Sequence, residues 1–428
     1  MGDISESGFN DCMYALVTGA NGGLGFALCC RLIDEFLQLR PKSQSLVLII
    51  TTRSKRKGDN TIELLKKRLK NNEGKSRITI RTETVDLSSL ISVKALSQRL
   101  LSSIPKLDAV FLNAGNPGFT GINWPVAIWS VLTDIPHAVT WPRFKLSRVG
   151  YLTQPQFPAT ETVVAKEPPL GEVFCSNLFG HYMLVHYIMS LLSRHSVDSP
   201  GRIIWISSIE AIAPKFSSTD LQGLRAMEAY EHVKRLTDIL FISGTLPSTS
   251  PWVNRFLTPP SSILEPSTKP RLYVSHPGIC ATNIVPLHPI LIFFMNCAFM
   301  LARFLGSPWH TCKAYLGATA PVWLALTPQS TLDAMESEDG AGAGKWGSST
   351  DIWGHERVQR TEVDEWGWGG KIGEKITKVM QSGRRKNAKI LTAEDRERFE
   401  EVGRLCWENM EQLREEWEER LKGVQKME

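Results

Sequence analysis

A glycine-rich turn between an apolar strand and an apolar helix constrains the fold of this chain more than any other feature. The run Tyr14–Val17 is apolar, the turn Thr18–Gly25 holds four glycines, and apolar residues then recur at helical spacing from Leu28 to Phe36. Glycines let a backbone approach a pyrophosphate closely, and the start of a helix offers free N–H groups. We predict a dinucleotide-binding turn; a glycine-rich turn without a ligand is the alternative.

The segments after this turn alternate between strand-like and helical patterns to about residue 282. Leu46–Ile50 is continuously apolar, as a strand buried on both faces of a parallel sheet is. Alternation of this kind predicts an α/β fold with a doubly wound parallel sheet, the Rossmann fold. The chain has 428 residues, 42% of them hydrophobic, so it can bury a large core.

The expected domain organisation is one dinucleotide-binding domain over residues 12–325 and a C-terminal extension over 331–428. Two insertions are expected within the domain. The first covers about 116–171 and contains two Trp-Pro pairs; the second covers about 243–270, is rich in Pro, Ser and Thr, and is predicted to be a loop.

The extension is predicted to contain an amphipathic helix over about 393–421. Its apolar residues follow a helical stripe, and Thr392 with Asp395 forms a plausible capping pair. This helix packs either on its own protein or on a partner.

The end of the second predicted strand bears on the choice of cofactor. An NAD-specific fold usually places an acidic residue there, which binds the ribose 2′-hydroxyl. This chain has Arg53 instead, followed by three cations in Lys55–Lys57. Arg53 therefore favours the 2′-phosphate of NADP, although the later cations also fit a solvated basic loop.

Polar residues that suit carbonyl chemistry follow later strands. Asn113 follows an apolar run, and Ser207 and Ser208 follow Ile203–Ile206. A serine there can hydrogen-bond a carbonyl, although serines at strand ends are often turn residues. Tyr230 and Lys234 stand four residues apart, on one face of a helix. A neighbouring ammonium lowers the pKa of a phenol, so we expect Tyr230 to exchange protons near neutral pH.

One ordered set of small and polar residues runs along these elements: Thr18, Gly19, Gly23, Gly25, Asn113, Ala114, Gly115, Asn177, Ser208, Tyr230, Lys234, Pro277 and Gly278. The set resembles the short-chain dehydrogenase/reductase family over about residues 12–325. The resemblance implies that Tyr230 is the acid/base and that Lys234 binds the nicotinamide ribose and lowers the pKa of the tyrosine. It also implies that Ser208 holds the carbonyl, with Ser207 as the competing serine, and that Asn177 supports a proton-relay water.

The same resemblance implies how NADPH or NADP is held. Asp86 would contact the adenine, and Thr282 would meet the carboxamide end of the cofactor. The remaining residues implied in cofactor binding are Gly19, Gly23, Leu24, Gly25, Arg53, Asn113, Tyr230, Lys234 and Ile279.

A narrower resemblance concerns three longer strings, at residues 113–124, 230–238 and 302–310. They are similar to the fungal 3-keto-steroid reductases of sterol C-4 demethylation. This implies NADPH-dependent reduction of the C-3 ketone of 4-methyl or 4-demethyl sterol intermediates to the 3β-hydroxyl, in ergosterol biosynthesis. Two alternatives stay open: a reductase of another lipophilic ketone, such as a retinal or fatty-acyl derivative, and a scaffold subunit of a sterol-synthesising complex.

That resemblance also implies partners and a location. The partners would be the C-4 oxidase, the C-3 decarboxylating dehydrogenase, an anchoring subunit and possibly oxidosqualene cyclase. The location would be the cytosolic face of the endoplasmic reticulum membrane, held peripherally, and lipid droplets.

Composition agrees with such a protein. The net charge of +5 fits an anionic cofactor or membrane surface, and no recognition module for nucleic acid accompanies the cations. The eight cysteines are scattered, so we expect reduced thiols rather than disulfides or a metal site. Residues 1–13 are polar and acidic, so we expect no secretory signal.

The apolar segment Leu287–Leu305 is expected to face a membrane and to cover the substrate. Pro289 and Arg303 bracket only thirteen residues, and Asn296 interrupts them. A spanning helix needs about 20 apolar residues, so we expect a segment that dips into one leaflet. A buried core helix is the alternative.

Overall fold

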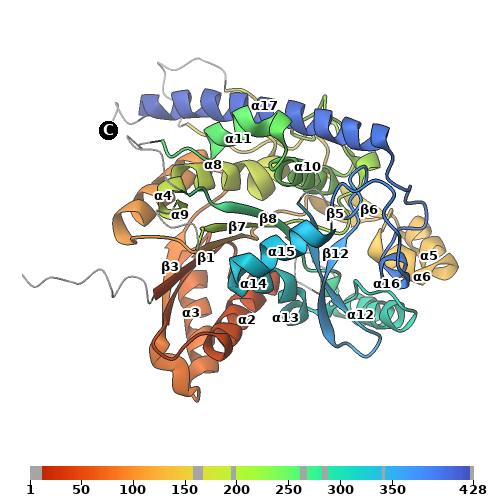
Figure 1. The fold of residues 1–428 in the computed structure, drawn as a ribbon, viewed down its shortest axis with the longest axis horizontal. Helices are drawn as coiled ribbons and strands as arrows, with labels where there is room; N and C mark the ends of the chain where they lie inside the picture. Colours follow the sequence, from red (N-terminus) through yellow and green to blue (C-terminus); the bar gives the residue numbers. More distant parts are fainter. Residues whose placement is uncertain are drawn as a thin grey trace, which may run out of the picture.

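An eight-stranded sheet runs through the middle of the molecule (Figure 1). The computed structural model describes residues 12–157, 167–193, 199–260, 268–281, 288–339 and 343–424. The strands of the sheet are β1 (Cys12–Val17), β2 (Ser45–Thr52), β3 (Ile78–Thr84), β4 (Ala109–Leu112), β7 (Arg202–Ile206), β8 (Arg271–His276), β11 (Lys345–Thr350) and β12 (Glu356–Thr361).

The strand order is β12-β11-β8-β7-β4-β1-β2-β3, and every pair except β11–β12 is parallel. The order reverses between β1 and β4, which are neighbours. In an open α/β sheet, ligands bind at the carboxyl ends of the strands beside such a switch point. The predicted doubly wound α/β fold is confirmed.

Helices cover both faces of the sheet, and each face has its own apolar core. The helices on one face are α4 (Leu90–Ser103), α7 (Glu172–Phe174), α8 (Gly180–Tyr187), α9 (Met189–Leu192), α10 (Ala229–Ser243) and α11 (Ser250–Phe256). Those on the other face are α2 (Gly23–Leu39), α3 (Lys55–Leu69), α13 (Ala314–Gly317), α14 (Thr319–Leu326) and α15 (Gln329–Asp339). The sheet is therefore sealed from water on both sides, as parallel sheets require.

The region expected as a C-terminal extension begins with strands of the central sheet. Strand β11 pairs in parallel with β8, and β12 returns antiparallel to it. The expected boundary at residues 325–331 would therefore divide the central sheet between two units. The polar sequence of β11 does not predict a strand, yet all six of its residues are buried.

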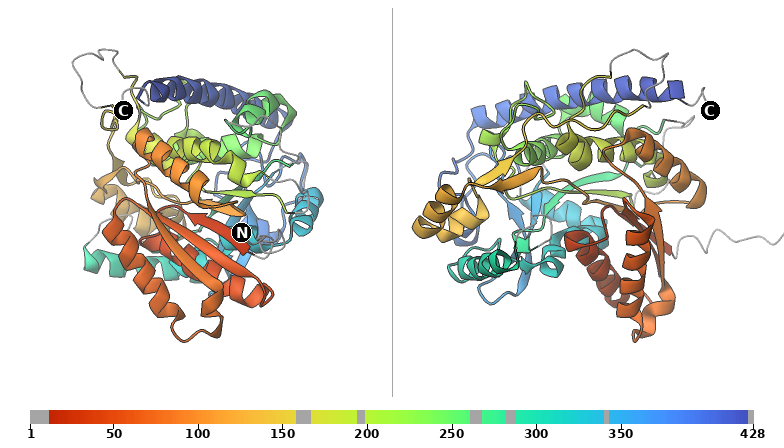
Figure 2. Two further views of the ribbon diagram at one scale, coloured as in Figure 1. Left: turned by 90° about the vertical axis from the view of Figure 1, so that its left-hand side faces the viewer. Right: turned by 180° about the vertical axis from the view of Figure 1, so that it is seen from behind.

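The C-terminal helix α17 (Ala393–Val424) lies across α10 and α11 as an additional layer (Figures 1 and 2). This matches the predicted helix, and the predicted cap is present, because the amide of Asp395 donates to Thr392 Oγ1 at 3.1 Å. Trp407 and Trp417 are fully buried, and Trp407 Nε1 donates to the carbonyl of Leu240 at 2.8 Å. The helix thus packs on its own protein.

The insertion after β4 forms a small unit of its own. Two antiparallel strands pair within it, β5 (Phe119–Ile122) and β6 (Lys145–Ser147), and the helices α5 (Trp124–Thr133) and α6 (Ile135–Thr140) lie between them in sequence. The second predicted insertion is not simply a loop: α11 forms within it. Pro251 suits the first turn of a helix, and Val253 and Phe256 are buried in the core.

The apolar segment near residue 290 forms α12 (Pro289–Phe304), next to a two-residue pairing of β9 (Cys280–Ala281) with β10 (Cys312–Lys313). Within α12 only Phe299 and Ala302 are buried. The alternative of a buried core helix is therefore wrong. Of the helices the structure describes, none has the length and apolar character to cross a bilayer.

Candidate functional site

The carboxyl ends of the parallel strands bring the predicted residues to one edge of the sheet. Each of these residues follows a different strand: Gly19 follows β1, Arg53 follows β2, Asp86 follows β3, Asn113 follows β4, Ser208 follows β7 and Ile279 follows β8. Thr282, the remaining predicted residue in this series, lies outside the described residues.

The glycine-rich turn has the shape that a pyrophosphate needs. Gly19 has a φ of +67°, and a Cβ there would lie 2.9 Å from the Cα of Ala114. A Cβ on Gly25 would lie 2.2 Å from the carbonyl oxygen of Gly19, so neither position admits a side chain. Beside Gly22 the space is open, and α2 begins without a side-chain cap or an acidic residue in its first turn. Its free N–H groups therefore fit an anion.

Asn113 locks the ends of β1 and β4 together. Its side-chain amide donates to the carbonyl of Thr18 at 2.9 Å, and Thr18 Oγ1 accepts from the backbone amides of Asn113 at 2.9 Å and Ala114 at 3.0 Å. These bonds fix the turn beside the switch point.

Two other predicted cofactor residues differ in their surroundings. Arg53 is exposed at the end of β2, where its guanidinium can meet a ligand. Asp86 is half-buried, and its Oδ1 accepts from both the amide of Ser88, at 3.0 Å, and the hydroxyl of Ser88, at 2.7 Å. One oxygen of Asp86 therefore holds the turn into α4. The predicted contact of Asp86 with adenine stays a prediction.

Ser208, Tyr230 and Lys234 come together at the end of β7. The side chain of Ser208 interacts with the phenol of Tyr230, in the direction that lowers its pKa. Lys234 Nζ lies 5.5 Å from the centroid of the Tyr230 ring and donates to the carbonyl of Ile206 at 2.6 Å. Ser207 instead donates to Asp238 Oδ1 at 2.6 Å, on the other side of the strand end. The geometry favours Ser208 over Ser207 as the serine that meets a carbonyl.

The pKa of Tyr230 departs from the sequence-based expectation. Burial raises it, because the phenolate loses solvation, and the carboxylate of Glu210 raises it further. Burial also lowers the pKa of Lys234, to about 8. The predicted net lowering of the tyrosine pKa is therefore wrong for this structure. A tyrosine in this environment stays protonated at neutral pH and is suited to donate a proton.

Asn177 lies within a π-helical turn, Cys175–Phe179, that leads into α8. Such turns occur frequently at functional sites. Its side-chain amide donates to the carbonyls of Asn116 at 2.8 Å and Val173 at 2.7 Å. Its Oδ1 is buried and has no hydrogen-bond partner. The predicted part of Asn177 in a proton relay stays a prediction.

Comparison with known proteins identifies the family. The chain is 49% identical to the 3-keto-steroid reductase of Aspergillus fumigatus, covering 96% of this chain and 95% of that protein. It is 38% identical to the 3-keto-steroid reductase of Gibberella zeae, covering 97% and 96% of the two chains. The chain belongs to the 3-keto-steroid reductase family. No family model matches the chain.

Solved structures give weaker matches than these reductase relatives. A Pseudomonas aeruginosa RhlG/NADP active-site complex aligns with a TM-score of 0.43 and 17% identity, covering 74% of this chain and 90% of that one. An alcohol dehydrogenase from Thermococcus sibiricus, complexed with 5-hydroxy-NADP, aligns with a TM-score of 0.42 and 14% identity, covering 80% and 97%.

A buried ion pair between Lys345 and Asp238 lies next to Ser207 and Ser208, and it was not predicted from the sequence. Lys345, on β11, donates to Asp238 Oδ2 at 2.5 Å and to the carbonyl of Ser208 at 2.7 Å. Asp238, on α10, also accepts from Ser207. The pair thus holds both serines in place. Its one sequence signal is Asp238, four residues after Lys234.

Sequence reasoning also missed a charged cluster beside Tyr230. Lys145, on β6 of the insertion, forms ion pairs with Glu210 and with Glu231, the latter at 3.4 Å, and its Nζ lies 5.9 Å from the centroid of the Tyr230 ring. Burial alone would lower the pKa of Lys145, but the two carboxylates outweigh it and raise that pKa. The adjacency of Glu231 to Tyr230 was the only local signal.

We expect Glu210→Gln to shift the pH dependence of catalysis. The Glu210 carboxylate raises the pKa of Tyr230, so removing this carboxylate lowers that pKa. As the pH rises, Tyr230 of the variant then loses its proton earlier than Tyr230 of the unmodified chain. The alkaline limb of the kcat/KM profile for reduction should therefore move to lower pH. Glu397→Gln, on the exposed face of α17, is the control. An unchanged alkaline limb would remove Glu210 from this role.

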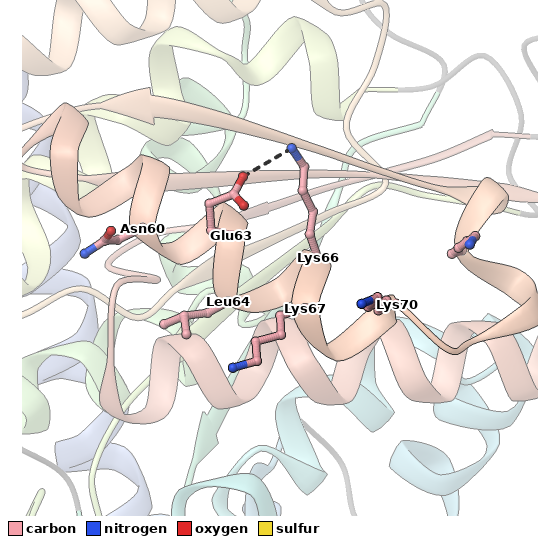
Figure 3. A pocket seen from close by; sticks show the side chains of 7 residues that line it. Asn60, Glu63, Leu64, Lys66, Lys67 and Lys70 are labelled. Atoms are coloured by element: carbon pink, nitrogen blue, oxygen red, sulfur yellow. Dashed lines mark ion pairs between the residues drawn. The ribbon is translucent and has the colours of Figure 1, made fainter.

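A shallow hollow of about 610 Å³ lies elsewhere, along the outer side of α3 (Figure 3). Lysine side chains dominate its lining, and one of them, Lys66, pairs with Glu63 at 3.5 Å. It includes none of the residues grouped around Tyr230, so we assign the chemistry to the strand ends and not to this hollow.

Proposed function

We propose that the chain reduces the C-3 ketone of a 4-methyl or 4-demethyl sterol intermediate to the 3β-hydroxyl with NADPH, in the C-4 demethylation step of sterol biosynthesis. The observation that carries this proposal is the 49% identity to a 3-keto-steroid reductase over almost the full length of both chains. The similarity includes the insertions and the C-terminal region, and not only the dinucleotide-binding part.

The residues at the end of β7 account for the proton that the reaction consumes. The side chains of Ser208 and Tyr230 interact, so we expect both hydroxyls to reach a single carbonyl oxygen. The O–H bond of Tyr230 breaks as its proton goes to that oxygen. Lys234, 5.5 Å from the ring centroid, then stabilises the phenolate that remains. The bound nicotinamide supplies the hydride to C-3.

The residues that would hold NADPH are the turn Gly19–Gly25, Asn113 and Arg53. We expect a strong preference for NADPH over NADH, because Arg53 offers a charge-assisted bond to the 2′-phosphate. Such a bond is worth about 1.5–3 kcal/mol, or about ten- to a hundredfold in affinity. Arg53→Ala should therefore raise the Kd for NADPH by that factor and leave the Kd for NADH unchanged. Equal affinity of the unmodified protein for both cofactors would remove this role from Arg53.

The proposal extends to location and partners. The proposed location is the cytosolic face of the endoplasmic reticulum membrane, where the protein binds peripherally, and lipid droplets. The exposed apolar helix α12 supports this location. The partners of the proposal are the C-4 oxidase, the C-3 decarboxylating dehydrogenase and an anchoring subunit, with oxidosqualene cyclase as a further partner.

The direct test is to incubate the purified protein with NADPH and a panel of ketones. The panel contains 3-keto sterols with and without 4-methyl groups, a retinal and a fatty-acyl ketone. The proposal expects turnover of the 3-keto sterols to 3β-alcohols. Faster turnover of the retinal or acyl ketone would reassign the substrate, and no turnover of any ketone would favour a scaffold role.

A further inference from the structure

One end of the molecule presents apolar side chains to solvent from three separate segments. These segments are α5, α12 and the turn 351–355 between β11 and β12. Both helices lie at the end of the molecule away from α3, in the front view and in the back view (Figures 1 and 2). We call the three segments together the apolar end.

Helix α5 exposes nearly all of its large side chains. Trp124, Ile128, Trp129 and Leu132 recur at helical spacing, and the side chains of Trp129 and Leu132 are 70% and 77% exposed. Only Ala127 of this helix is buried. An exposed stripe of this kind on a short helix of an insertion has no role in the core of the protein.

Helix α12 exposes a second stripe. Large side chains point to solvent at residues 290, 293, 294, 300, 301 and 304, a spacing of three to four residues that lies along one side of a helix. Phe293 and Phe294 are 63% and 62% exposed, whereas Phe299 and Ala302 pack inward. The helix is thus amphipathic, with its larger apolar face outside.

Contacts join these segments into one surface. Helix α6 packs against both α5 and α12. A Cβ on Gly354 would lie 3.0 Å from the guanidinium of Arg303, so the turn that carries Trp353 lies beside α12. Trp353 is 73% exposed.

The exposed charged side chains beside the apolar end are mainly cationic; of the nearby carboxylates, Asp134 and Asp351 are held in ion pairs. Helix α5 carries no charged residue, and Arg303 is the only one in α12. The neighbouring segment 371–389 exposes five lysines, namely Lys371, Lys375, Lys378, Lys386 and Lys389. Lys386 pairs with Asp134 at the junction of α5 and α6, and Trp309 Nε1 donates to the carbonyl of Gly383, so this segment adjoins the apolar end.

The apolar end is connected to the site around Tyr230. Trp141, which follows α6, donates through Nε1 to the carbonyl of Ile209 at 3.2 Å, next to Ser208. Lys145 of the same insertion lies beside the ring of Tyr230. The insertion that exposes the apolar stripe of α5 therefore also contacts the residues around Tyr230.

We propose that the apolar end docks on the surface of an anionic phospholipid bilayer, with α5 and α12 lying in the interface and the lysines of 371–389 against the headgroups. Tryptophan and phenylalanine beside lysines are typical of surfaces that lie in this layer. The excess of exposed lysines in 371–389 favours an anionic lipid surface over a protein partner, which would not require that excess. That this docking serves the entry of a membrane-borne sterol rests on the proposed function; the docking itself does not.

The test is co-sedimentation of the purified full chain with vesicles of phosphatidylcholine and phosphatidylserine, and with vesicles of phosphatidylcholine alone. Trp129→Ser/Leu132→Ser and Phe293→Ser/Phe294→Ser should each weaken binding to both vesicle types by about tenfold or more. Lys375→Ala/Lys378→Ala should weaken binding about tenfold only where phosphatidylserine is present. Leu39→Ser/Leu64→Ser, two exposed leucines on α2 and α3, is the matched control and should bind as the unmodified chain does.

All the substituted side chains are exposed, so each variant should fold. Thermal melting verifies that it does. Three results would overturn the proposal: no vesicle binding by the unmodified chain, full binding by both apolar variants, or an oligomer that binds no vesicles and dissociates in the apolar variants. The last would assign the apolar end to contact between copies of this chain. Because binding is read without turnover, a protein that binds vesicles but reduces no ketone would refute only the proposed function.

Discussion

Replacing Tyr230 with phenylalanine is expected to lower kcat for ketone reduction by about 10²–10⁴-fold, the range that acid/base catalysis contributes. The hydroxyl interacts with Ser208 and is the group that we expect to give up a proton. The ring would remain, so the Kd for NADPH should stay nearly unchanged. Lys234→Ala should impair both turnover and cofactor binding, because that lysine is expected to serve both.

Tyr273→Phe provides the matched control for this substitution. Its hydroxyl is also buried and accepts a hydrogen bond from Gln329 at 2.8 Å, but it lies on β8, outside the group around Ser208. That variant should keep its turnover. If Tyr230→Phe retained more than about a tenth of the unmodified kcat, Tyr230 would not be the proton donor.

Lys345→Met is expected to destabilise the protein by about 3–5 kcal/mol, because it leaves the Asp238 carboxylate buried without its counter-charge. The side chains of Lys345 and Asp238 are 3% and 0% exposed, so water cannot replace the lost partner. Urea denaturation measures the change as a lower midpoint at an unchanged slope. The double variant Lys345→Met/Asp238→Leu should recover much of the loss, since it removes both charges.

Lys378→Met, at an exposed lysine on α16 (Lys378–Ser382), is the control and should change stability by less than about 0.5 kcal/mol. A loss below about 1 kcal/mol for Lys345→Met would show that the pair adapts to the missing lysine. Equal losses in the single and double variants would show that packing, and not charge, determines the effect.

The residues at the strand ends could be predicted from the sequence because each lies next to its own structural signal. Gly19, Asn113 and Ser208 directly follow apolar runs, and parallel strands bring such positions to one edge. Lys345 could not be found this way, since it meets Asp238 across 107 residues of chain. Lys145 reaches Glu210 from the insertion, where the sequence gives no signal that places β6 beside Tyr230.

Strand β11 shows why a polar sequence concealed part of the sheet. Four of its six residues are Lys345, Ser348, Ser349 and Thr350, which suggest a loop. Their polar groups find partners inside the protein: Ser348 Oγ donates to the carbonyl of Gly317 at 2.7 Å, and Lys345 pairs with Asp238. The hydrogen-bond and ion-pair partners of these polar groups come from distant segments of the chain, so the local sequence of β11 does not reveal them.

The raised pKa of Tyr230 has the same origin. A spacing of four residues predicts that Lys234 lies beside the ring, and it does, at 5.5 Å from the centroid. The sequence does not reveal the burial of the phenol or the approach of Glu210, and these two effects set the direction of the shift.

Transfer of deuterium from NADPH that carries deuterium in both positions at C-4 of the nicotinamide tests the central claim most directly. The purified chain is incubated with labelled NADPH and a 3-keto sterol, and the product is examined by mass spectrometry. We predict a 3β-alcohol with one deuterium at C-3, formed by the unmodified chain and reduced at least about a hundredfold in rate by Tyr230→Phe. A product without deuterium at C-3, or no sterol alcohol from the unmodified chain, would contradict the account.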